Sequence, residues 1–251
     1  MPGCATEHEN VGTNADVAGK NACSTSYIFS IRWTSGKSMT TATAQIHADI
    51  RANRLQQTLA VWYLVFWVLT GISPVDRRDW LLENFLVVVF SGLIIATYRR
   101  FPLSDVSYVL IAIFLTLHSI GAHYTYPQVP IGQWAKDVFH LSRNHFDRVV
   151  HFSFGLMLAY PARELFLRVA KARGFWAYYL PIDVIVALSA MYEIMESWFA
   201  KIIGPGLGDA WLGTQGDIWD SQNDMTAALA GAVICMAITA ILQRRYRNRF
   251  S

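Results

Sequence analysis

The chain has 251 residues, of which 53% are hydrophobic and only 16% are charged. Soluble domains carry about 25% charged residues, so the composition excludes an ordinary soluble domain and indicates a membrane protein. The formal net charge of +3 is too small to indicate a nucleic-acid partner. The three cysteines, at positions 4, 23 and 235, have neither the spacing of a metal site nor that of a disulfide framework.

The N-terminal region, residues 1–54, is polar and rich in Ser, Thr, Ala and Asn, without the apolar periodicity of an amphipathic helix. Its one apolar stretch, residues 27–33, is too short and too broken for a signal peptide, and no small-residue cleavage site follows it. We therefore expect residues 1–54 to form a disordered or weakly ordered cytoplasmic tail. In an alternative interpretation, Met39 is the true start and residues 1–38 are not native.

Six apolar segments have the length of about 20 residues that a membrane-spanning helix needs. The fourth is the least apolar, because Pro161, Arg163 and Glu164 fall in its last third. Residues 55–243 are therefore predicted to form an all-α, polytopic membrane helix bundle of about six transmembrane helices, followed by a basic cytoplasmic tail at 244–251. The six segments run approximately over residues 55–72, 80–98, 106–126, 149–169, 176–199 and 225–242.

The distribution of Lys and Arg predicts the orientation of these spans, because such residues concentrate on the cytoplasmic side. The side that holds both termini carries twelve Lys and Arg residues near the span ends, and the opposite side carries six. Both termini are thus expected in the cytoplasm. The two longest loops, residues 127–148 and 200–224, then lie on the outer side.

Three carboxylates, those of Asp217, Asp220 and Asp224, directly precede the last span. If a helix begins near Asp217, their spacing of i, i+3 and i+7 places them on one helical face. A helix start needs only one acidic cap. Three aligned carboxylates at a membrane boundary therefore indicate a functional site.

Ionisable residues of other spans are expected at the same boundary. Asp147 and His151 are spaced i, i+4 where the fourth span begins, and Glu193 lies near the outer end of the fifth. Ionisable groups within spans are costly and usually face an interior, a cavity or each other. We take as candidate ligands or acid–base groups Asp147, His151, Glu193, Asp217, Asp220 and Asp224, with His123, Glu196, Gln215 and Asn223 in supporting positions.

A divalent metal ion would relieve the repulsion within such a cluster, because carboxylates packed together raise one another's pKa values. The predicted ligands are His151, Glu193, Asp217 and Asp220. A histidine with several oxygens suits Zn, Mn or Fe, whereas oxygens alone suit Mg or Ca. The bound ion would activate water or polarise a phosphoryl or acyl group.

Each residue also has a purely structural interpretation. In this interpretation, Asp217 or Asp220 only caps a helix, and Asp147 only pairs with Arg143 or Arg148. His118 and His123 are flanked by apolar residues, which is typical of packing histidines.

Three motifs resemble the YjdF family of bacterial inner-membrane proteins. They are Asn144-His145-Phe146-Asp147-Arg148-Val149-Val150-His151-Phe152, Tyr192-Glu193-Ile194-Met195-Glu196 and the long run from Gly213 to Met225. The resemblance covers about residues 39–245. It implies a multi-pass protein of the bacterial cytoplasmic membrane and no particular reaction.

The leading functional hypothesis is a metal-dependent, hydrolase-like enzyme that acts on a lipid or envelope substrate at the outer face. An ion- or proton-coupled transporter is the first alternative, although transporters usually carry polar groups near the bilayer midplane and broken helices. A non-catalytic membrane scaffold or sensor is the second alternative. The only partners that the sequence implies are the lipid bilayer and such a substrate.

Overall fold

The computed structural model describes residues 39–203 and 214–249, and all regular secondary structure in these ranges is helical. By internal contacts the chain divides into residues 1–47 and residues 48–251, and the second unit is the one described below. The expectations for residues 1–38 and for residues 204–213 of the predicted outer loop at 200–224 lie outside the described residues. The described helices are α1 (Met39–Thr70), α2 (Arg77–Thr97), α3 (Asp105–Tyr124), the 3-10 helix η1 (Tyr126–Gln128), α4 (Pro130–Phe139), α5 (Phe146–Arg168), α6 (Trp176–Ile203) and α8 (Asp220–Arg249).

Each of the six predicted spans lies on one of the long helices, α1, α2, α3, α5, α6 and α8. Within the described residues, α2, α3, α6 and α8 are long and apolar enough to cross a membrane. Their outward apolar side chains stay exposed in the isolated chain, as lipid-facing side chains do. Examples are Leu81, Phe85 and Ile95 of α2. The fold is therefore that of a helical membrane protein.

Two regions that we expect to be irregular are helical. Helix α1 begins at Met39, well before the predicted span, so the polar residues 39–54 extend the helix. This stretch contains several alanines, which favour helix without needing an apolar face. The expected outer loop at 127–148 contains η1 and α4. Pro127 and Pro130 fall in the first turns of these two helices, where proline is tolerated.

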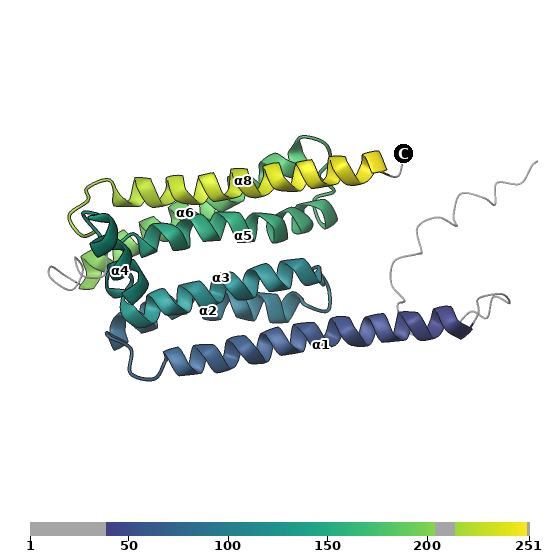
Figure 1. Cartoon of the computed structure of the whole chain (residues 1–251), viewed down its shortest axis with the longest axis horizontal. Helices are drawn as coiled ribbons and strands as arrows, with labels where there is room; N and C mark the ends of the chain where they lie inside the picture. The colour runs from purple at the N-terminus through teal and green to yellow at the C-terminus, as the bar shows by residue number, and fades with distance from the viewer. Residues whose placement is uncertain (1–38, 204–213, 250–251) are drawn as a thin grey trace, which may run out of the picture. The chain divides into compact units, whose positions relative to one another are not determined.

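Helix α4 is short and amphipathic. Its apolar side chains Ile131, Trp134, Val138 and Phe139 are each at least half exposed and recur at helical spacing. Figure 1 shows α4 beside the end of the bundle at which α8 begins. An exposed apolar stripe in that place suits a helix that lies in the membrane interface.

Helices α5 and α8 pack closely along their lengths (Figure 1). At their contact, Gly155 of α5 faces the carbonyl oxygen of Ala228, and Gly231 of α8 faces the carbonyl oxygen of Phe152. A Cβ atom on either glycine would overlap the partner helix's backbone. Such close packing is typical of small residues between membrane helices.

The carboxylate of Glu164, near the C-terminal end of α5, joins the start of α3 to α5. Glu164 accepts hydrogen bonds from the backbone N–H of Ser104 at 2.9 Å and from the Ser107 hydroxyl at 2.8 Å. Arg168 lies 3.8 Å from the other Glu164 oxygen. The N-terminal end of α3 therefore contacts the C-terminal part of α5. The C-terminal end of α3 lies near the N-terminal end of α5.

Replacing Gly155 with Ala should lower the thermal stability of the purified protein, because the added methyl group meets rigid backbone of α8. Overpacking of this kind costs about 1–3 kcal/mol. Circular dichroism during heating in detergent measures the effect. Gly92→Ala is the matched control, since a Cβ atom at Gly92 meets nothing within 4 Å. An unchanged melting temperature in Gly155→Ala would show that α5 and α8 are not in close contact.

Candidate functional site

The last helix, α8, begins at Asp220, so Asp217 lies before it. The prediction of three aligned carboxylates on one helical face is therefore wrong for Asp217. One Asp217 oxygen accepts a hydrogen bond from the backbone N–H of Trp219 at 2.9 Å, and the other accepts one from the Asn223 amide at 3.1 Å. Asp217 thus stabilises the start of the helix from outside it. Asp220 and Asp224 remain on one face, spaced i, i+4.

A turn at residues 214–217 docks this helix start onto the segment before α5. Gln215 and Gly216 both have positive φ, 49° and 88°, and the Asp217 N–H donates to the Thr214 carbonyl at 2.9 Å. The Gln215 side chain then holds the backbone of Asn144 twice. Its amide donates to the Asn144 carbonyl, and its oxygen accepts from the Asn144 N–H, both at 3.0 Å.

Asn144 joins three segments around the site. Its side-chain amide donates to the carbonyls of Pro127 at 2.9 Å and Val129 at 3.1 Å, while its side-chain oxygen accepts from the Phe146 N–H at 3.0 Å. The residue is 1% exposed. Gly132 of α4 packs directly on this side chain, where any Cβ atom would overlap it. Asn144 therefore fixes η1, α4 and the start of α5 relative to the turn at 214–217.

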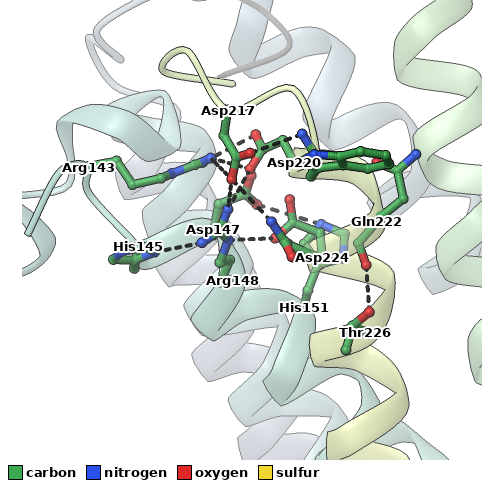
Figure 2. A network of polar contacts seen from close by, with 12 residues as sticks. Arg143, His145, Asp147, Arg148, His151, Asp217, Asp220, Gln222, Asp224 and Thr226 are labelled. Atoms are coloured by element: carbon green, nitrogen blue, oxygen red, sulfur yellow. Dashed lines mark hydrogen bonds and ion pairs between the residues drawn. The ribbon is translucent and has the colours of Figure 1, made fainter.

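Two arginines form the outer layer of the site (Figure 2). Arg143, which is 3% exposed, donates to both carboxylate oxygens of Asp220. Arg148 donates to Asp217 and also lies 3.3 Å from Asp220. Hydrogen bonds of this kind between ions are about twice as strong as neutral ones. We refer to Arg143, Arg148, Asp217 and Asp220 as the arginine layer.

Two pKa values outside the membrane spans are lowered in and beside this layer. The Trp219 N–H, followed by Arg148 and Asn223, holds the pKa of Asp217 below its ordinary value of 3.8 against the opposing effect of desolvation. Desolvation, together with Arg148 and Arg143, lowers the pKa of His145. The His145 ring is therefore neutral near pH 7, and its Nδ1 accepts a hydrogen bond from Arg148 at 3.3 Å.

A second group of side chains lies on α5, α6 and α8 next to the arginine layer. The His151 Nε2 atom is 3.6 Å from an Asp147 oxygen and 3.4 Å from a Glu193 oxygen. One ligand atom each from Asp147, His151 and Asp224 lie within 4.8 Å of one another. Glu193 Oε1 and Asp224 Oδ1 are buried and accept no hydrogen bond from the described part of the chain. We call Asp147, His151, Glu193 and Asp224 the inner cluster.

The inner cluster differs from the ligand set predicted from sequence, which is His151, Glu193, Asp217 and Asp220. Arginines hold Asp217 and Asp220, so the structure groups Asp147 and Asp224 with His151 instead. Ser189 of α6 supports the histidine from the other side, with its hydroxyl 3.5 Å from His151 Nδ1.

The predicted supporting residues separate in the structure. Gln215 and Asn223 belong to the frame of the site through their bonds to Asn144 and Asp217. His123 lies elsewhere, with Nδ1 2.8 Å from the Thr70 carbonyl, and thereby joins α3 to the end of α1. Glu196 lies on α6 near Tyr192, outside the inner cluster.

A further buried polar group, which we did not predict, lies behind the inner cluster. The Tyr192 hydroxyl donates to Glu83 of α2 at 2.7 Å, and the Tyr192 ring contacts His151 edge-on at 5.9 Å between centroids. His118 Nε2 is 3.8 Å from the Glu83 carboxylate, and the Tyr126 hydroxyl lies 2.7 Å from His118 Nδ1. The sequence signal was Glu83 itself, an acid two turns into an apolar helix.

The surface beside the arginine layer is hollowed. A depression of about 280 Å³ is lined by Thr214, Gly216, Asp217, Ile218, Asp220 and Ser221. This volume is near the lower limit of ligand pockets, so it suits a small polar group rather than a whole large ligand.

Comparison with known proteins identifies relatives of the chain. Residues 55–245 match the family described as "Predicted membrane protein (DUF2238)". The chain is similar to the inner membrane protein YjdF of Escherichia coli (strain K12), with 40% identity over 194 residues, which cover 77% of this chain and 92% of the relative. No solved structure matches the chain. With its apolar helices, these matches make the chain a multi-pass bacterial inner membrane protein.

Lowering the pH should destabilise the protein through Asp217. Because its pKa is lower in the folded than in the unfolded state, its contribution is complete above the unfolded value, near 3.8, and disappears as the pH falls through the folded value. The difference in melting temperature between wild type and Asp217→Asn, measured in detergent, should therefore be largest at pH 7 and should narrow as the pH falls below about 4 toward pH 3. Asp137→Asn, at an exposed acid of α4, should show no such convergence. A constant difference between wild type and Asp217→Asn would contradict this assignment.

Proposed function

We propose that this chain, which belongs to the DUF2238 family of membrane proteins, is a metal-dependent enzyme whose inner cluster binds a divalent cation. The observation that carries the proposal is the convergence of Asp147, His151 and Asp224, with ligand atoms within 4.8 Å of one another. Buried carboxylate oxygens without hydrogen-bond donors, on Glu193 and Asp224, are costly unless a cation or proton compensates them.

The charge balance supports a cation. Five carboxylates, those of Asp147, Glu193, Asp217, Asp220 and Asp224, gather around the two arginines of the arginine layer. Ionised together, they leave about three negative charges without a fixed positive partner. A protonated His151 would remove one of these charges, and a divalent ion would remove two.

The donor set suits a transition metal. Ligand atoms that lie about 2.0–2.2 Å from a tetrahedral zinc ion are about 3.3–3.6 Å apart. The three groups, whose ligand atoms lie within 4.8 Å of one another, would therefore close by at most about 1.5 Å around the ion. If Nε2 of His151 binds the ion, the Nδ1–H faces the Ser189 hydroxyl at 3.5 Å, an outer contact that orients metal-binding histidines. One histidine nitrogen with carboxylate oxygens favours Zn, Mn or Fe.

Different residues of the chain would perform different parts of a hydrolysis reaction. A bound cation would supply a water molecule of lowered pKa. Glu193 Oε1 lies 3.4 Å from His151 Nε2 and has no hydrogen-bond donor among the described residues, so it is placed to accept a proton beside the ion. Arg148, with its side chain 23% exposed, is the arginine placed to meet a phosphate or an oxyanion of the substrate.

A lipid or envelope precursor is the proposed substrate, acted on at the outer face. The depression beside Asp217 opens close to the site, and the exposed apolar stripe of α4 provides an adjoining surface for a lipid tail. We also propose that α1 and α5 cross the membrane together with α2, α3, α6 and α8. Six spans return the C-terminus to the side of the N-terminus, and the distribution of Lys and Arg places that side in the cytoplasm.

Elemental analysis of the detergent-purified protein tests the proposal. Wild type should carry about one Zn, Mn or Fe ion per chain. The variant Asp147→Asn/Asp224→Asn should lose the ion, because two of its three ligands become amide oxygens, which bind metals more weakly than carboxylate oxygens do. Asp217→Asn should keep the ion, since Asp217 binds Arg148 rather than the metal. Removing the metal with a chelator should lower the melting temperature of wild type but not that of the double variant. Full metal retention in the double variant would reject the site.

Proton-coupled transport is the second candidate, and the buried group around Glu83 favours it. Glu83 is 4% exposed on α2, and it contacts Tyr192 and His118 from two other helices inside the bundle. Intramembrane acids of this kind form proton pathways in transporters. A scaffold or sensor has no comparable observation in its favour, since it requires neither group of buried acids.

Proteoliposomes distinguish transport from the enzyme. If the chain moves protons, vesicles loaded with a pH-sensitive dye should acidify faster than empty vesicles under an imposed membrane potential. Glu83→Gln should then abolish the difference, because the amide cannot exchange a proton. Asp105→Asn, which changes an acid at the start of α3, should leave the proton flux unchanged. Wild-type vesicles that acidify no faster than empty ones would remove this candidate.

A further inference from the structure

A groove of about 1000 Å³ opens between α3, α5 and α8, away from the arginine layer and toward the opposite ends of α5 and α8. Most of its wall is apolar, and its polar side chains gather toward the end of α8. Residues of this wall include Leu110, Leu156, Ile238 and Leu242, with Gln243 and Tyr246 at the polar end. Its volume equals that of a large ligand pocket.

At the polar end of the groove, Gln243 contacts one cationic and one neutral side chain. The Gln243 side-chain oxygen accepts hydrogen bonds from Arg163 of α5 at 3.0 Å and from the Tyr178 hydroxyl at 2.6 Å. The Arg163 guanidinium also lies over the Tyr178 ring, 4.7 Å from its centroid. Since the oxygen of Gln243 is occupied, its amide N–H groups are the part of this side chain left to bind a ligand.

Arg163 lacks a counter-ion in the described part of the chain. The residue is 6% exposed, and its Nε is buried without a hydrogen-bond acceptor. Its described partners, Gln243 and Tyr178, are both uncharged. A buried cation is costly without an anion beside it. By contrast, Arg168 one turn later pairs with Glu164.

We propose that this groove binds one acyl chain of an anionic phospholipid, with the lipid phosphate held between Arg163 and the Gln243 amide. The apolar wall matches the chain, and the missing counter-ion matches the phosphate. Arg244 and Arg245, exposed directly after Gln243, add positive charge at the same end of α8. This site shares no residue with the inner cluster, so it stands or falls independently of the proposed metal.

Native mass spectrometry with phosphatidylglycerol and with diacylglycerol of identical acyl chains, which lacks the phosphate, tests the proposal. Wild type should bind the anionic lipid about tenfold more tightly, the factor expected for a hydrogen bond to a charged group. Arg163→Gln should remove this preference. Arg99→Gln, which removes an exposed arginine after α2, should keep it. Equal affinities for the two lipids in wild type, or an unchanged preference in Arg163→Gln, would overturn the proposal.

A second variant tests the groove without changing Arg163. Ile238 is 48% exposed and lines the wall, so Ile238→Trp should be tolerated while filling the space for the acyl chain. Binding of phosphatidylglycerol should weaken at least about tenfold in this variant. Leu81→Trp, at an exposed position of α2, is the control and should bind as wild type does. Unchanged lipid binding in Ile238→Trp would place the lipid elsewhere and reject the groove.

Discussion

The close contact between α5 and α8 is the constraint on which the candidate site depends. Because Gly155 and Gly231 present no side chain, the two backbones approach until carbonyl oxygens face Cα atoms. His151 lies one turn before Gly155, and Asp224 lies two turns before Gly231. At this separation, ligand atoms of His151 on one helix and Asp224 on the other lie within 4.8 Å of each other.

Two groups of charged residues lie beyond this contact, toward the starts of α5 and α8. The arginine layer neutralises the carboxylates nearest the helix starts, and its geometry is fixed by the Gln215–Asn144 bonds and the buried Asn144 side chain. The inner cluster has no arginine of its own at hydrogen-bond distance in the described contacts and retains buried oxygens without donors. Buried polar groups that lack partners mark the places where a protein is ready to bind an ion or a proton.

The two ends of α8 lie near uncompensated charges of opposite sign. Near the start of α8, acids exceed the cations available to them, which favours a metal or a proton. Near the end of α8, Arg163 is buried among neutral partners beside an apolar groove, which favours an anionic lipid. In each case the uncompensated charge lies on a side chain that is buried away from water, where an unpaired charge costs the most free energy.

Hydropathy alone determined the helical membrane class and the approximate positions of the long helices, because about 20 apolar residues in sequence are a local property. The spacing of ionisable residues at the span ends also marked the acids at 217–224 and the pair Asp147 and His151. Only the tertiary structure decided which acids remain for an ion. The pair Arg143 and Asp220 joins residues 77 positions apart, and the turn at 214–217 moves Asp217 off the helix. Such pairings depend on how closely α5 and α8 approach, which no spacing within either helix specifies.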